Sequence, residues 1–260
     1  MRAPSAKEKP QPLESAARLA QSSKIQFTMA RLTRLVIAGV AHHVIHRAVA
    51  GGVAFADAHD RAHFLKILQR CSAEHRVAVH AYVLLDHEFQ LMVTPEAADQ
   101  LSRMMQALAR FYVPAFNRRH ARAGALWQGR FRAAPVAGAQ ALLDCMRYLE
   151  QAPIRTLPSA SALGFDGSSA AHHAGRVIDP LLSAVPTASA YWALGNTPFA
   201  RDAAYQLLLE IPLAAEVAAR LEAATPMGWA LTSDGALLEM SHTAPRRLKS
   251  QPKGRPVKRI

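Results

Sequence analysis

The chain has 260 residues and a formal net charge of +12, with 31 Lys and Arg side chains against 19 Asp and Glu. This excess favours a polyanionic partner, either nucleic acid or an anionic membrane surface, and charge alone does not separate the two. Cys71 and Cys145 form no CxxC pattern, which argues against a disulfide framework and a zinc cluster and suits a reducing compartment. No apolar run approaches the ~18 residues of a membrane span, and the first residues lack the apolar core of a secretory signal.

The N-terminal part of the sequence changes character near residue 29. Residues 1–28 mix Pro, Ser, Ala, Lys and Glu without an apolar period, which predicts a disordered extension, and Met29 offers an alternative start of translation. The β-branched residues of 36–49 predict a strand. An amphipathic helix over roughly 58–75 follows, because apolar residues recur there at helical spacing and Asp57 stands at the N-cap position.

The middle of the chain continues the alternation of strands and helices. Two apolar runs, 77–85 and 89–93, predict short strands joined by a tight connection. The apolar stripe of 101–112 predicts a helix, which Pro114 should kink or end. A further strand is predicted over 126–136.

A helix over 139–151, stopped near Pro153, completes this pattern. The order strand-helix-strand-strand-helix-strand, followed by a helix, is that of a ferredoxin-like sandwich. That is an α+β fold with an antiparallel sheet and helices on one face. We therefore expect one domain over 29–155.

The remaining residues predict an appendage of three parts. Residues 156–186 are rich in Ser, Gly and Pro and are predicted as a loop-rich linker. Residues 187–244 are predicted as a small helical region, with two or three short helices between 199 and 240. Residues 245–260 hold seven Lys or Arg and no acid, so we expect a disordered basic tail.

Six short segments occur in a fixed order along the predicted domain. They are Met29–Val36, His42–Ile45, Ala81–Leu84, Phe116–His120, Leu126–Phe131 and Cys145–Glu150. Together they resemble the REP-associated tyrosine transposases, a branch of the HUH single-tyrosine transposases. The resemblance covers 29–155 and continues more weakly through Tyr191–Gly195 and Gly228–Leu231.

The resemblance implies a fold, an activity and a set of partners. A ferredoxin-like core, usually a homodimer, cuts single-stranded DNA beside imperfect hairpins during transposition. A tyrosine hydroxyl attacks the phosphate and forms a 5′-phosphotyrosine link, while a divalent metal, magnesium or manganese, polarises the phosphate. The implied location is cytoplasmic and nucleoid-associated, of prokaryotic type, with no membrane partner.

The family's nucleophilic tyrosine lies four residues before an Asn-Pro pair, on the helix after the last strand. In this chain that position is Tyr148, and Pro153 keeps the place of the proline. The alternative interpretation of Tyr148 is a core tyrosine on an amphipathic helix. Arg147 beside it is a candidate contact for a DNA phosphate.

The family's metal site is a His-hydrophobic-His triplet on a strand, whose first and third residues share one face. The triplet at that place is Glu88-Phe89-Gln90, so both histidines are absent. The third family ligand falls at Ala152, which offers no donor atom. Glu88 and Gln90 supply oxygen ligands that suit magnesium or manganese weakly. The loss of all three usual ligands predicts metal-dependent cleavage that is impaired or absent, and no cofactor if the activity is lost.

Basic residues near the last strand and in the tail are candidate DNA contacts. Arg130 and Arg132 should share a strand face, and Trp127 nearby could stack a base or pack in the core. Lys253-Gly254-Arg255-Pro256 resembles the core of a minor-groove hook, so Lys253 and Arg255 are included. The alternative is a solvated basic tail that adds affinity for any nucleic acid.

Three functions follow from this sequence. The first is a transposase-family protein that binds hairpin or single-stranded DNA, with impaired strand cleavage and joining. The second is a domesticated or decayed transposase that binds hairpins without cutting. The third is an RNA-binding module, which would need exposed aromatic residues on the central strands of the sheet.

Overall fold

A computed structural model describes residues 34–157, 161–232 and 234–249. The predicted extension over 1–28 lies outside the described residues, as do residues 250–260 of the predicted tail. The elements of the domain, in chain order, are β1 (Ala41–Arg47), α1 (Ala58–Glu74), β2 (Val77–Leu85), β3 (Glu88–Pro95), α2 (Gln100–Arg119), β4 (Arg132–Ala137) and α3 (Ala139–Glu150). No helix among the described residues is both long enough and apolar enough to span a bilayer.

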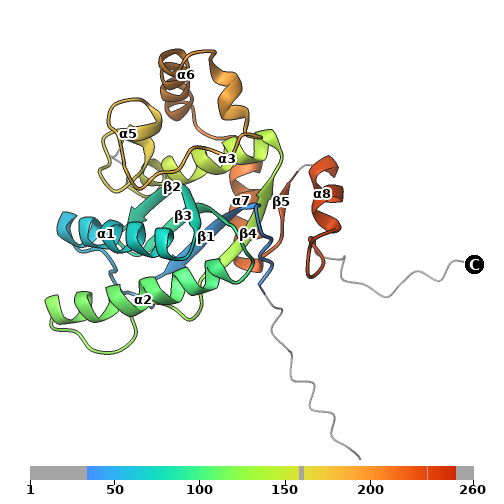
Figure 1. The fold of residues 1–260 in the computed structure, drawn as a ribbon. Helices are drawn as coiled ribbons and strands as arrows, with labels where there is room; N and C mark the ends of the chain where they lie inside the picture. The colour runs from blue at the N-terminus through green and yellow to red at the C-terminus, as the bar shows by residue number, and fades with distance from the viewer. Residues whose placement is uncertain (1–33, 158–160, 233, 250–260) are drawn as a thin grey trace, which may run out of the picture. The chain divides into compact units, whose positions relative to one another are not determined.

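The five-stranded sheet has the order β2-β3-β1-β4-β5, where β5 is the short strand Leu231–Thr232 (Figure 1). The pairs β2·β3, β3·β1 and β1·β4 are antiparallel. This arrangement is the ferredoxin-like topology, so the predicted α+β class is confirmed. The added strand β5 pairs parallel to β4, which makes the complete sheet mixed rather than purely antiparallel.

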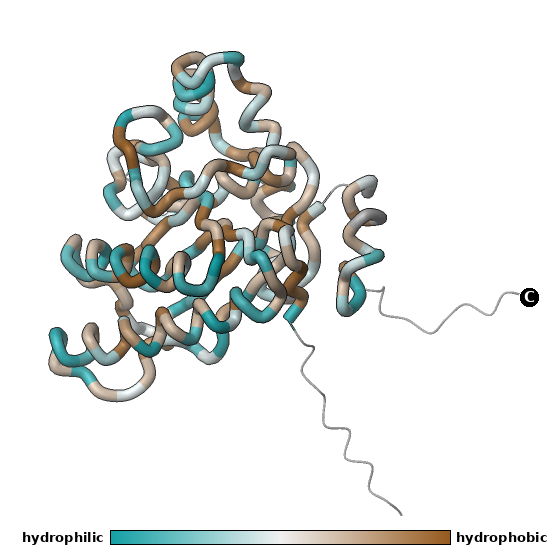
Figure 2. Tube along the Cα trace, viewed as in Figure 1, coloured by the Kyte–Doolittle hydropathy of each residue, from teal (hydrophilic) through white to brown (hydrophobic). Residues whose placement is uncertain are grey.

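Helices cover both faces of the sheet (Figure 1). The two helices of the ferredoxin-like core, α1 and α2, lie on one face and bury an aromatic cluster there. That cluster contains Phe55, Phe64, Phe89, Tyr112 and Trp127. The other face packs against α3 and against the C-terminal helix α7 (Ala215–Met227). Figure 2 shows hydrophobic residues alternating with hydrophilic ones along α1 and α2, as expected for helices with one buried side.

The C-terminal part adds short helices. They are α4 (Ala152–Thr156), α5 (Ala170–His173), the 3-10 helix η1 (Ala190–Leu194) and α6 (Pro198–Glu210) near α3, and α8 (Asp234–Ser241), which packs against Leu35 and Ile37. The carboxylate of Glu150, at the end of α3 and fully buried, joins several of them. It accepts hydrogen bonds from Ser169, from His173 Nδ1 at 2.6 Å and from the Tyr205 hydroxyl at 2.7 Å. This carboxylate fastens α5 and α6 to the domain, because buried donors and acceptors must be paired.

The β2 edge of the sheet has a backbone partner, and β4 has one along its last two residues. At the β2 edge, the segment 167–183 runs beside the strand: Leu84 N donates to Gly167 O at 2.7 Å, and Ser183 N donates to Val79 O at 2.7 Å. An isolated bridge between Val83 and Ser168 lies between these bonds. At the opposite edge, β5 covers β4.

Two predicted strands are shorter in the structure. The strand expected over 36–49 is limited to Ala41–Arg47, because a turn with Gly39 at φ +71° precedes it. The strand expected over 126–136 begins only at Arg132, since Gly129 at φ +64° forms a bend and only a single bridge joins Trp127 to Ala48. Both glycines adopt the left-handed region that interrupts a ladder.

Of the two effects predicted for Pro114, ending the helix is wrong, because α2 continues to Arg119. A proline inside a helix removes one backbone hydrogen bond. Tyr112 and Phe116, on either side of it, are both buried in the aromatic cluster. Their packing across the proline holds the helix together.

Candidate functional site

Tyr148 lies over the strand positions where the family carries its metal ligands. Glu88 and Gln90 on β3 pair with Arg47 and Ile45 on β1, so their side chains share one face with His43. The ring of Tyr148, from α3, meets the His43 ring edge-on with centroids 5.8 Å apart. The predicted nucleophile and the two predicted metal positions are therefore brought to one place.

A chain of hydrogen bonds links these polar residues to one another. His43 Nδ1 lies 2.8 Å from the Thr225 hydroxyl of α7, and Nε2 lies 3.0 Å from Gln90 Oε1. Gln90 Nε2 donates to Glu88 Oε1 at 2.6 Å. Burial lowers the pKa of His43 to about 4, so the imidazole is neutral near pH 7. Its Nε2–H then donates to Gln90, and its Nδ1 accepts the Thr225 proton.

The buried carboxylate of Glu88 is balanced by a guanidinium group. Arg47 Nε donates to Glu88 Oε2 at 2.7 Å, while Glu88 Oε1 receives the Gln90 amide. The Arg47 side chain is 49% exposed and that of Glu88 only 7% exposed. A carboxylate that has lost most of its water needs such a partner, and arginine supplies both the charge and a directed hydrogen bond.

These side chains do not fit a divalent cation. Both oxygens of Glu88 and the only oxygen of the Gln90 side chain already accept hydrogen bonds. The Arg47 guanidinium lies beside the Glu88 carboxylate and supplies the positive charge that a metal ion would otherwise supply. Ala152 is buried and presents only a methyl group. The magnesium or manganese that the family resemblance implies has no free set of ligands here.

Tyr148 is itself nearly buried and lies against a second arginine. The Arg155 guanidinium stands over the Tyr148 ring, 4.1 Å from its centroid, and its Nη2 donates to the Tyr148 carbonyl. Burial raises the pKa of Tyr148; the positive charge of Arg155 opposes that rise, while the negative charges of Glu222 and Glu88 add to it. The phenol is therefore protonated at neutral pH, and an attack by its oxygen would need a base.

Three arginines gather beside this face. Arg132 pairs with Ile45 on β1 and, two residues before Ala134, lies on the face that α3 covers. Arg130 is exposed in the preceding bend. The Arg34 guanidinium lies 3.9 Å from the Phe131 centroid. Burial, then the charges of Arg130 and Arg132, lower the pKa of Arg34, so the three cations lie close enough to repel one another.

The structure gives the other predicted contacts different positions. Arg147 is buried, and its Nη2 donates to the carbonyls of Leu208 at 3.0 Å and Ile211 at 2.8 Å, at the end of α6. That guanidinium is committed inside the protein, so we propose no DNA contact for it. Trp127 packs in the core, stacked on His46 with centroids 4.8 Å apart. Lys253 and Arg255 lie outside the described residues.

Sequence reasoning missed Arg47, Arg155 and Thr225 as members of this site. The strand period of two places Arg47 on the same face as His43, and this signal was present in the sequence. Thr225 lies 182 residues from His43 along the chain, and no local pattern connects them.

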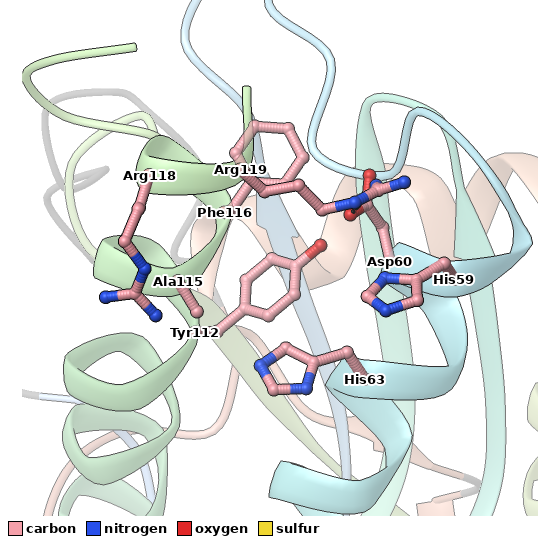
Figure 3. Close-up of a pocket in the computed structure, with 8 residues that line it drawn as sticks. All are labelled: His59, Asp60, His63, Tyr112, Ala115, Phe116, Arg118 and Arg119. Carbon is pink, nitrogen blue, oxygen red and sulfur yellow. Dashed lines mark hydrogen bonds and ion pairs between the residues drawn. The ribbon is translucent and has the colours of Figure 1, made fainter. Parts of the chain in front are cut away.

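A second polar cluster lies between the start of α1 and the end of α2 (Figure 3). Asp57, His59 and Asp60 place possible metal-binding atoms within 4.8 Å of one another. Arg119, however, bonds to Asp60 at 2.5 Å and to Asp57 at 2.6 Å. The two carboxylates thus hold α2 to the N-terminus of α1, where Asp57 also caps the helix.

No protein-family model matches the chain, and no curated protein sequence matches it. Several solved structures are similar to it, among them the following two. One is described as the "structure of the REP associates tyrosine transposase bound to a REP hairpin"; it is 14% identical with a TM-score of 0.49, over 60% of this chain and 92% of that one. The other is described as a "putative transposase from deinococcus radiodurans r1", 17% identical with a TM-score of 0.33, over 42% and 83%. Both names belong to the class that the ordered motifs resemble, and likeness at this level carries no argument about activity.

Proposed function

We propose that this chain binds single-stranded or hairpin DNA in the manner of a single-tyrosine transposase, and that metal-dependent strand cleavage and joining are impaired in it. One observation carries the proposal. Tyr148 lies over Glu88 and Gln90, as the family arrangement requires, but these two side chains are bonded to Arg47 and His43. The side chains at the two predicted metal positions are thus already hydrogen-bonded to other residues.

The basic surface beside the site supports DNA as the partner. Arg132 lies on the sheet face that carries Tyr148, Arg34 and Arg130 lie near it at the start of β4, and the whole chain has a net charge of +12. Arginines spaced along a rim contact successive phosphates and release counterions on binding. A nucleoid-associated location and a homodimer would accompany this function, and both stay proposals.

A non-catalytic hairpin-binding protein is the second candidate, favoured by the same hydrogen bonds around Glu88. A protein that only binds DNA does not need a free carboxylate, and Arg47 stabilises the site without a metal. The RNA-binding alternative is less favoured. Helices cover both faces of the sheet, and Phe89 on the central strand β3 is only 1% exposed, so the strands offer no aromatic platform among the described residues.

Covalent adduct formation separates the first two candidates. The protein is incubated with hairpin DNA and magnesium or manganese, and DNA–protein adducts are sought on a denaturing gel. We expect little or no adduct at ordinary magnesium levels, because no free set of oxygen ligands is available. Strong cleavage by the unaltered protein would overturn the proposed impairment.

A gain-of-function variant sharpens this experiment. Glu88→His, Gln90→His and Ala152→Asn together restore the family's three ligand types, and Arg47→Met removes the competing cation. We expect metal affinity to rise and adducts to appear, and to disappear when Tyr148→Phe removes the hydroxyl alone. Adducts that persist with Tyr148→Phe would assign the nucleophile to another residue. A variant that binds metal and hairpin DNA but forms no adduct favours the non-catalytic candidate.

DNA binding itself is tested by affinity as a function of salt. We expect hairpin or single-stranded DNA to bind more tightly than plain duplex, with affinity falling steeply as salt rises. Deleting residues 245–260 should flatten that salt dependence and leave the hairpin preference unchanged. Equal affinity for hairpin and duplex at every salt concentration would contradict the proposal.

A further inference from the structure

The seam between α1 and α2 forms a second basic surface, on the sheet face opposite Tyr148. The two helices pack side by side (Figure 1), and their ends are joined by the ion pairs of Arg119. One stripe of α1, at spacings of three and four residues, faces outward along the seam. It consists of His59, His63, Lys66 and Arg70. The 17 residues of α1 make this seam ~25 Å long, enough to run beside about seven base pairs.

The α2 side of the seam is equally basic. This helix contains four arginines and no acidic residue over its 20 residues. Arg118 lines the pocket with His59 and His63, a hollow of about 220 Å³ between the two helices (Figure 3). The seam therefore presents positive or neutral groups along its length.

An aromatic ring at the surface lies between two of these cations. The Arg70 guanidinium lies 3.9 Å from the Phe111 ring centroid, and that of Arg110 lies 5.0 Å from it. Phe111 is 36% exposed although most aromatic residues of this layer are buried. Guanidinium groups stacked on a ring are held in place with their donors directed outward, so they are preorganised for anionic oxygens.

The acids of the seam do not neutralise these cations. Asp57 and Asp60 are committed to Arg119. Across residues 34–157, 161–232 and 234–249, no ion pair within 4.0 Å involves Lys66, Arg70 or Arg110. After Asp60, the only acidic residue of α1 is Glu74, one turn after Arg70. Among the described residues, Glu74 forms no ion pair within 4.0 Å. A surface of unpaired cations with an exposed ring matches a phosphate backbone in charge and shape.

We propose that the α1–α2 seam is a second DNA contact, which binds the backbone of DNA extending beyond the segment held at the Tyr148 face. This inference rests on the proposed function, because it assumes that the first contact also binds DNA. The seam does not recognise a base sequence, because arginines on a helix surface reach phosphates, and the Phe111 ring holds the Arg70 and Arg110 guanidinium groups in place. If the seam binds DNA in this way, the affinity should increase with DNA length once the DNA is longer than the segment that the Tyr148 face covers.

The test compares two double variants of the full chain that remove the same charge. Arg70→Gln with Arg110→Gln alters the seam, and Arg76→Gln with Arg176→Gln is the matched control, since both control arginines are exposed and lie outside α1 and α2. Affinity is measured by fluorescence anisotropy across a salt series, for a single strand of about 8 nucleotides and for a hairpin with a long duplex stem. Circular dichroism checks that both variants fold.

We expect the seam variant to lower the salt slope for the long hairpin by about 1.8, from two lost phosphate contacts to the duplex stem, and to leave the short strand unchanged. The control should change the slope by less than half as much. Equal changes in both variants, or no change in the seam variant, would overturn the second contact while the first stands. A wild-type protein that binds neither DNA would instead remove the proposed function. Acetylation of Lys66 gives an independent readout: long DNA should slow it, and equal labelling with and without DNA counts against the seam.

Discussion

The two faces of the sheet are built from the same strands but by different chemistry. On β3, Phe89 points into an aromatic cluster beneath α1 and α2, while its neighbours Glu88 and Gln90 point into a chain of hydrogen bonds beneath Tyr148. On β1, Val44 and His43 divide in the same way. One face is stabilised mainly by apolar burial, and its few polar atoms, such as the Tyr112 hydroxyl that donates to Ala54 O, are paired. The other face contains buried polar groups, each of which needs a hydrogen-bond partner. Burying them costs desolvation free energy, which a face of apolar residues avoids.

This difference between the two faces indicates which of them is built around a functional site. Buried polar networks cost stability unless every member is bonded, and they persist where a function once used or still uses them. The polar face bears Tyr148 and the predicted metal positions Glu88 and Gln90, whereas the strand residues beneath α1 and α2 serve mainly to pack the core. If the two faces are stabilised differently, substitutions and changes of pH should alter the stability of the protein differently on each face.

The largest effect is expected on the aromatic face. Phe89→Ala should lower the free energy of unfolding by about 3–5 kcal/mol, because it leaves a cavity amid Phe64 and Trp127. Urea denaturation measures the loss. Phe199→Ala is the matched control, since that ring is 85% exposed and its removal should change stability by less than about 0.5 kcal/mol. Similar losses for the two variants would contradict the assignment of the core.

The next effect is a pH dependence confined to the polar face. The pKa of His43 is about 4 in the folded protein, below its ordinary value of 6.5. Between pH 6.5 and 4, His43 is therefore protonated in the unfolded chain but not in the folded protein. The free energy of unfolding accordingly decreases as the pH falls from 6.5 toward 4. His43 alone should contribute a loss on the order of 3 kcal/mol over that range.

Comparing the wild type with His43→Gln isolates this contribution. Glutamine stays neutral at all pH values, while His42 and His46, whose pKa values burial also lowers to about 4, remain in both proteins. Urea denaturation at several pH values should show a shallower acid loss in the variant. Parallel curves would mean that His43 takes up its proton without unfolding.

A smaller effect on stability is expected from removing the Arg47 guanidinium, which forms an ion pair with Glu88. Arg47→Met should cost about 1–3 kcal/mol, less than for a fully buried pair, because the Arg47 side chain is half exposed. Glu88→Gln in the same protein should recover most of that loss, since the uncompensated charge is then gone. The double-mutant cycle measures this coupling by thermal and urea denaturation. Additive losses would show that the ion pair does not stabilise the site.

The smallest effect is expected for the hydroxyl of Tyr148. Among the described residues this oxygen makes no hydrogen bond, so Tyr148→Phe should change stability by less than about 0.5 kcal/mol. The ring packing against His43 and Arg155 is retained. A melting temperature close to that of the wild type would make this variant a clean control for adduct formation. A large loss would reveal a structural role for the hydroxyl.

Local patterns in the sequence predicted most of the domain. The strand over 77–85 agrees with β2, and the helix capped by Asp57 agrees with α1 within one residue. These elements carry their own signals, a β-branched run in one case and an N-cap with an apolar stripe in the other. The two-residue strand β5 was missed because its formation depends on pairing with β4 and not on its own sequence.

The site was predicted only in part, for the same reason. The spacing around Pro153 and the strand triplet located Tyr148, Glu88 and Gln90, and the structure brings them together. The partners that decide the chemistry, Arg47 and Thr225, come from contacts across the sheet and from α7. Arg147 was misjudged because a basic residue beside a candidate nucleophile suggests a phosphate contact, whereas helical phase turns its side chain toward α6.

The covered sheet edges have a consequence for behaviour in concentrated solution. An unpaired strand edge is a template on which other chains add strands, which leads to aggregation. Here the segment 167–183 bonds along β2, and β5 caps β4. The 167–183 segment is held there by its own backbone bonds to β2 and by the bonds of Ser169 and His173 to Glu150. Glu150 thus contributes to covering this edge as well as joining the helices.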